Sequence, residues 1–110
     1  MAGMDIAKLR KLVALDENDP LSRLALGRKL LELNESPAML AEAAEHLRFS
    51  NQHSPDHLAT YHLLGQALIQ LGRTDEAKRV LHEGVQRVRG IGEGMGRDLG
   101  PAMRELLASL

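Results

Sequence analysis

The fold is decided by residues 58–89, LATYHLLGQALIQLGRTDEAKRVLHEGVQRVR. Two rows of apolar residues run through this stretch, and within each row most neighbours lie three or four positions apart. Such spacing places apolar side chains on one face of an α-helix. Gly72 can adopt the left-handed conformation that ends a helix, and Thr74 or Asp75 can cap the next helix. The stretch therefore predicts a helical hairpin.

Composition predicts a single all-α domain over residues 4–110. The chain has 110 residues, 44% of them hydrophobic, and only Phe49 and Tyr61 are aromatic. A chain of this length forms one core, and a shortage of aromatic and β-branched residues disfavours strands. The net charge is −1 and no cysteine is present. These values argue against nucleic-acid or membrane binding and against disulfide and cysteine–zinc sites, and we expect a cytoplasmic protein.

Prolines and polar clusters divide the rest of the chain. Apolar residues at helical spacing predict a first helix within residues 4–17, with Asp5 as its cap. Pro20 and Pro37 stand where helices begin, and Asn51–Asp56 and Gly72 interrupt the pattern. Alternating glycines over residues 90–97 predict a flexible linker. A last helix is expected over residues 98–109, with Asp98 as a possible cap, which makes about six helices.

Two of the predicted hairpins repeat one another. Residues 26–30 (LGRKL) align with residues 64–68 (LGQAL), and their glycines are 38 positions apart. Residues 43–47 (AAEHL) align with residues 77–81 (AKRVL), 34 positions later. The difference corresponds to four extra residues in the connection of the first hairpin. We therefore assign a first repeat to residues 20–53, a second to residues 55–89 and half a repeat to residues 4–17.

With this register the chain resembles the tetratricopeptide repeat, whose unit has about 34 residues. Tyr61 stands at the family's first aromatic position, and Leu64 with Gly65 forms its Leu-Gly pair. Gly84 replaces a common alanine, and Arg23 occupies the aromatic position of the first repeat. The resemblance implies antiparallel hairpins stacked in a short right-handed superhelix. The half repeat and the last helix would act as its caps, because so few repeats bury little surface.

The same resemblance implies a concave groove lined by the first helix of each repeat, in which a partner protein or peptide binds. Apolar groove positions would contact the partner and polar ones would orient it. For Leu24 and Leu31 the alternative is a place in the core. A co-chaperone subfamily uses a Lys/Asn/Arg clamp, but Leu24, Arg28 and Leu63 do not match it. The expected groove residues are Leu24, Arg28, Leu31, Glu32, Ala59, His62, Gln66 and Ile69.

The sequence thus predicts a non-catalytic adaptor that needs no cofactor. One alternative is a homodimer, held together by its own groove or by a last helix that crosses to a second chain. A small enzyme or histidine–metal protein is a third possibility. His53, His57 and His62 lie within ten residues, but they lack the spacing of known metal motifs. The carboxylates stand at capping or solvent-facing positions, and the glycines match no nucleotide-binding motif.

Overall fold

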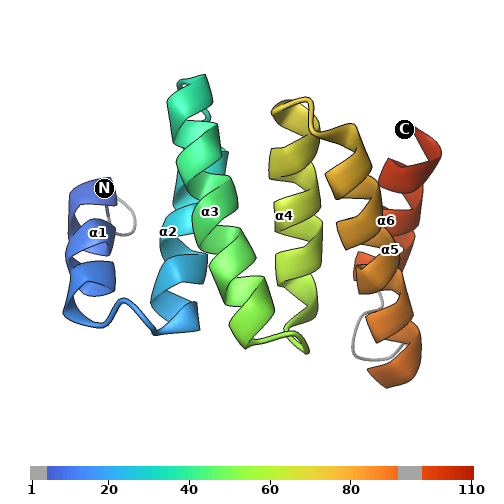
Figure 1. Ribbon diagram of the computed structural model, residues 1–110, viewed down its shortest axis with the longest axis horizontal. Coiled ribbons are helices and arrows are strands. Elements are labelled where there is room, and N and C mark those ends of the chain that lie inside the picture. Colours follow the sequence, from blue (N-terminus) through green and yellow to red (C-terminus); the bar gives the residue numbers. More distant parts are fainter. Residues whose placement is uncertain (1–4, 92–97) are drawn as a thin grey trace.

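The computed structural model describes residues 5–91 and 98–110, and these residues form six helices and no strand. The predicted all-α class is confirmed. Successive helices run in opposite directions and stack side by side along the long axis (Figure 1). They are α1 (Ile6–Leu15), α2 (Pro20–Leu33), α3 (Pro37–His53), α4 (Leu58–Gln70), α5 (Thr74–Ile91) and α6 (Leu99–Ala108).

Local sequence explains most of the helix ends. The carboxylate of Asp5 accepts a hydrogen bond from Lys8 N at 2.9 Å. Asp19 and Ser36 cap α2 and α3 in the same manner, and each stands just before a proline that begins its helix. Gly72 has φ 78°, so it takes the left-handed conformation expected for the turn between α4 and α5. Capping side chains therefore set the starts of α1, α2 and α3, and a left-handed glycine sets the turn after α4.

The helices form two layers. We call α2, α4 and α6 the A layer, in which α4 contacts both α2 and α6. We call α1, α3 and α5 the B layer, in which ion pairs join α1 to α3 and α3 to α5. In Figure 1, α3 lies in front of α2, and α5 lies in front of α6. Each helix thus packs against its chain neighbours, the A-layer helices also contact one another, and side-chain ion pairs bridge the B layer.

Glycines permit the closest approach inside the two hairpins. A Cβ atom added to Gly27 would lie 2.8 Å from Leu47 Cγ, and one added to Gly65 would overlap the side chain of Leu81. Leu47 and Leu81 are both fully buried. Because the two glycine–leucine contacts are equivalent, each hairpin of the alignment packs in the same way.

The structure differs from the sequence prediction at four places. The connections of the two aligned hairpins are equally long, residues 34–36 and 71–73, so the four extra residues of the first repeat lengthen α2 and α3 and not the connection. Pro55 lies in a turn, and α4 begins at Leu58 with His57 before it. Gly90 and Ile91, predicted as linker, continue α5, because nothing there stops the helix. Asp98 precedes α6 but makes no side-chain capping hydrogen bond. The remainder of the predicted linker, residues 92–97, and the start of the first segment at residue 4 lie outside the described residues.

Candidate partner-binding surface

The expected groove residues lie on two neighbouring helices of the A layer. Four belong to α2 and four to α4, and α2 contacts α4. The ends of the two helices are also joined by a 2.7 Å hydrogen bond from Asn34 Nδ2 to Gln70 Oε1. The fold therefore brings the two sets of residues into one layer, although they are separated by more than 30 positions in the sequence.

Two of the eight residues belong to the core. Leu24 and Leu31 are each 8% exposed and pack in the cluster that includes Leu9, Leu30 and Leu47. Helix α2 lies between α1, α3 and α4, so it buries apolar side chains on several sides. Of the two roles that the sequence left open for Leu24 and Leu31, the structure supports the role in the core.

The other six residues reach the surface to different extents. Arg28 and Glu32 are exposed on α2, whereas Ala59, His62, Gln66 and Ile69 are half-buried on α4. Burial lowers the pKa of His62, which favours the neutral imidazole. A neutral imidazole offers one hydrogen-bond donor and one acceptor. The surface is therefore polar and charged on α2 and more apolar on α4.

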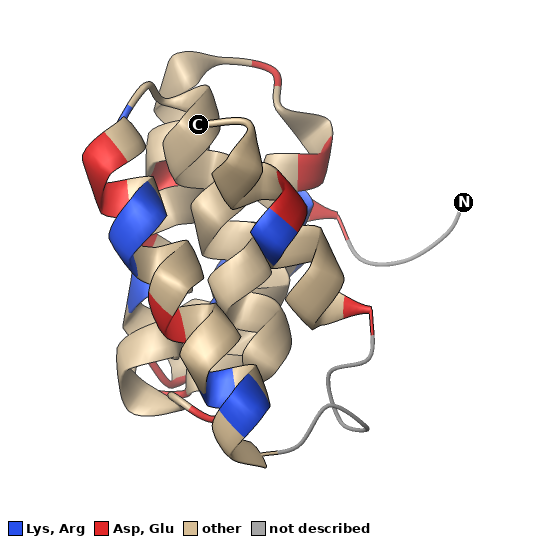
Figure 2. Ribbon diagram, turned by 90° about the vertical axis from the view of Figure 1, so that its right-hand side faces the viewer, with Lys and Arg blue, Asp and Glu red and all other residues tan. Residues whose placement is uncertain are grey.

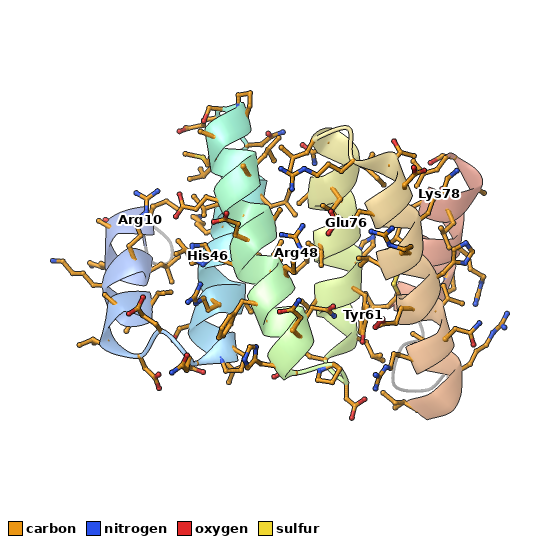
Figure 3. All side chains as sticks on the ribbon, viewed as in Figure 1. Arg10, His46, Arg48, Tyr61, Glu76 and Lys78 are labelled. Atoms are coloured by element: carbon orange, nitrogen blue, oxygen red, sulfur yellow. The ribbon has the colours of Figure 1, made fainter. Side chains whose placement is uncertain are left out.

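The B layer carries equivalent ion pairs at two successive junctions. Arg10 of α1 donates to Glu42 of α3 at 2.8 Å, and Arg48 of α3 donates to Glu76 of α5 at 2.7 Å (Figure 3). The hydrogen bond from Arg10 lowers the pKa of Glu42. Glu42 and Glu76 are 34 positions apart and therefore occupy the same place in the repeat. The sequence predicts capping or solvent-facing positions for such carboxylates, whereas the fold gives these two glutamates arginine partners on neighbouring helices.

Arg23 fills the place of the missing aromatic residue in the first repeat. Its guanidinium lies 4.2 Å from the centroid of the Phe49 ring, and its Nε donates to Glu17 O at 2.9 Å. At the equivalent position in the second repeat, Tyr61 is buried and donates from its hydroxyl to Pro55 O at 2.6 Å. Both side chains thus tie a helix to the connection that precedes it.

Two clefts open beside α5. The α3/α5 cleft, of about 570 Å³, contains three arginines and two glutamates: Arg48, Arg79, Arg87, Glu76 and Glu83. The terminal cleft, of about 530 Å³, lies between α5 and α6. Its charged lining residues are all basic, namely Lys78, Arg89 and Arg104. Neither cleft is lined by the expected groove residues. The sequence did not predict the terminal cleft, because the basic residues of α5 are interspersed with acidic residues along the chain.

Within the part of the chain that the structure describes, no three histidine, aspartate or glutamate side chains converge as metal ligands. His57 Nδ1 lies 2.9 Å from Thr60 Oγ1, and His53 Nδ1 lies 2.9 Å from Phe49 O. Each of these imidazoles thus has a partner on its own helix or connection. No helix among residues 5–91 and 98–110 has both the length and the apolar character needed to cross a membrane.

Comparison with known protein families gives one match. A family model described as tetratricopeptide repeat matches residues 39–90, a segment that runs from α3 through α5. The match covers the α4–α5 hairpin and the helix that precedes it. No curated protein matches the chain.

Proposed function

Since residues 39–90 match the tetratricopeptide-repeat model, we propose that this protein is a non-catalytic adaptor that binds a segment of a partner protein on its A layer. Helical repeats of this kind present extended concave surfaces for binding. The segment would be an amphipathic helix or an extended peptide. The binding surface comprises Arg28, Glu32, Ala59, His62, Gln66 and Ile69.

One observation carries the proposal. Residues that hairpin packing does not fully bury are gathered on two helices, α2 and α4, that touch one another. Ile69 packs at the edge of both core clusters, so a partner's apolar side chain placed there would extend an existing apolar surface. Arg28 and Glu32 lie one turn apart and offer opposite charges that fix the orientation of the partner.

A photo-crosslinking experiment tests the location of the surface. A photoreactive phenylalanine analogue replaces Gln66, a half-buried residue of α4, and the partner crosslinked in native lysate is identified by mass spectrometry. The same analogue at Arg73, an exposed residue of the turn before α5, is the control. We expect a partner that crosslinks from position 66 and not from position 73. Equal crosslinking at both positions would contradict the proposed surface.

The Arg28→Glu variant then tests the chemistry. Charge reversal should weaken binding of the identified partner about tenfold, because an oriented contact becomes repulsive. Because Arg28 is exposed, the melting temperature of the Arg28→Glu variant should stay within about 2 °C of the wild-type value. The matched control is Arg73→Glu, which should leave binding unchanged. A comparable loss of binding in the control, or a large fall in the melting temperature of Arg28→Glu, would refute the assignment.

A further inference from the structure

The terminal cleft is a basic surface with an apolar floor. Lys78 and Arg89 of α5 and Arg104 of α6 line it, together with the apolar side chains of Val85, Leu107 and Leu110. No aspartate or glutamate is among its lining residues. Figure 2 looks onto this end of the molecule and shows basic segments on both helices. Such a lining attracts a carboxylate-rich ligand that also carries apolar side chains.

The bases of the terminal cleft are unpaired among the described residues. Neither Lys78 nor Arg89 nor Arg104 forms an ion pair with a carboxylate there. In the α3/α5 cleft, by contrast, Arg48 pairs with Glu76 and Arg87 donates to Asp56 at 2.9 Å. On α5, Glu76 lies toward α3 and Lys78 lies toward α6 (Figure 3). Helix α5 therefore turns different charges to its two neighbours.

The repeat register shows what kind of element fits the terminal cleft. His82, Val85 and Gln86 of α5 lie 34 positions after Arg48, Asn51 and Gln52 of α3. Those residues of α3 face α5, the next helix of the B layer. Their counterparts on α5 face the terminal cleft, beyond which no further helix of the B layer lies among the described residues. The cleft is thus the position at which one more helix would continue the stack.

We infer that the terminal cleft docks an acidic amphipathic helix of a partner protein, which adds to the B layer as its next helix. The apolar stripe of that helix packs on Val85, Leu107 and Leu110, and its carboxylates meet Lys78, Arg89 and Arg104. The contact repeats the chemistry by which α5 joins α3, where Glu76 meets Arg48. This surface is separate from the A-layer surface proposed above, so the protein would join two partner segments.

Charge argues against a second copy of this chain as the occupant. In a head-to-tail assembly α1, at the other end of the stack, would enter the terminal cleft (Figure 1). Residues 6–15 of α1 include Lys8, Arg10 and Lys11 and no acidic residue. Bases would then face bases, a juxtaposition that is unfavourable at an interface. The occupant therefore comes from a protein of different charge.

Binding of designed peptides to the full-length protein tests the inference. The probe is a fluorescent 18-residue helical peptide with leucines along one face and glutamates along the other, matched in length to α5. We expect its anisotropy to rise on titration with protein and the affinity to fall several-fold between about 0.05 and 0.5 M salt. The double variant Lys78→Glu/Arg104→Glu should weaken binding at least tenfold. Backbone amide shifts should concentrate in α5 and α6.

Three controls distinguish helix docking from general charge attraction. A peptide with lysine in place of every glutamate should not bind. A peptide of the same composition in scrambled order, without the apolar stripe, should bind at least tenfold more weakly. Arg79→Glu, an exposed charge reversal on the α3 side of α5, should change affinity by less than about twofold. Circular dichroism melting of each variant confirms that the fold is retained.

Several results would overturn the inference: no binding of the acidic peptide up to millimolar protein, equal binding of the scrambled peptide, or an equal loss in Arg79→Glu. Sedimentation at several protein concentrations tests whether a second copy of this chain occupies the cleft instead. A wild-type dimer that Lys78→Glu/Arg104→Glu dissociates would show that a second copy fills the cleft. Because Arg28→Glu leaves the terminal cleft intact, it should bind the peptide normally. A failure of the A-layer proposal is thereby distinguishable from a failure at this cleft.

Discussion

The face of α3 that meets α5 and the face of α5 that lines the terminal cleft use equivalent repeat positions, but they differ in chemistry. On the α3 side, Arg48 pairs with Glu76, and the amide of Asn51 lines the α3/α5 cleft. On the α6 side, the equivalent positions hold His82 and Val85. The α3 side has its basic and acidic groups close together, whereas the α6 side has bases and an apolar floor. The same repeat geometry therefore gives an internal junction on one side and a surface suited to a partner on the other.

This difference also depends on how α6 is held. Met103 of α6 is fully buried against α5 and α4, and its Sδ would lie 2.5 Å from a Cβ atom added to Gly84. Gly84 stands where the family commonly has alanine, so the missing methyl group is what lets Met103 enter. On the α3 side, the part-buried ion pair of Arg48 with Glu76 joins the two helices instead. Apolar contacts hold the terminal helix, and the ion pair adds a smaller contribution to the internal junction.

The largest expected effect is that of Met103→Ala, which should weaken the packing of α6 on α5. Removing a fully buried methionine side chain costs about 2–5 kcal/mol of unfolding free energy, through lost burial and the cavity left behind. Urea denaturation followed by circular dichroism measures the change. The variant should also bind the acidic peptide more weakly. A loss below about 1 kcal/mol would show that α6 contributes little to the stack.

An intermediate effect is expected for Gly84→Ala. The new methyl group would lie 2.7 Å from Tyr61 Cβ, which cannot move without its backbone, so about 1–3 kcal/mol of stability should be lost. Gly90→Ala is the matched control on the same helix, because nothing lies within 4 Å of an added Cβ there. That substitution should be neutral or raise stability by up to about 1 kcal/mol through helix propensity. Equal melting temperatures for the two variants would contradict the close contact of α5 with α4 and α6.

The smallest effect is expected for Glu76→Gln, which removes the charge that joins α3 to α5. The side chains of Arg48 and Glu76 are 31% and 28% exposed, so the pair contributes at most about 1 kcal/mol, and added salt reduces that. Lys78→Gln, two positions away, should leave stability unchanged and reduce only peptide binding. Melting curves at low and high salt measure both variants. A salt-independent loss in Glu76→Gln would indicate that shape rather than charge holds this junction.

Much of the fold was predictable because local chemistry sets it. Asp5, Ser36 and Gly72 satisfy or end the helix backbone whatever the rest of the chain does. The two glycine–leucine contacts join residues that the alignment had matched, Gly27 with Gly65 and Leu47 with Leu81. Helix starts without a strong cap were less well predicted. The second repeat was assigned from residue 55, but α4 begins only at Leu58.

The candidate surfaces were less predictable, because exposure depends on neighbours that are distant in sequence. Leu24 and Leu31 show the same helical spacing as residues that line a groove, yet contacts with neighbouring helices place them in the core. The mixed charges of α5 looked like an ordinary solvated helix. Only the positions of α3 and α6 around that helix show that Glu76 lines one cleft and Lys78 lines the other.

The sequence by itself determined that the chain forms paired helices in a repeat register, because hydrophobic periodicity, capping residues and glycines act over a few residues at a time. The tertiary structure decided which faces of those helices remain accessible. It also decided that Gly84 makes room for Met103 and that Lys78, Arg89 and Arg104 meet around an apolar floor. The physical reason is that burial and electrostatic fields are sums over whatever the fold brings close, and sequence spacing does not record those distances.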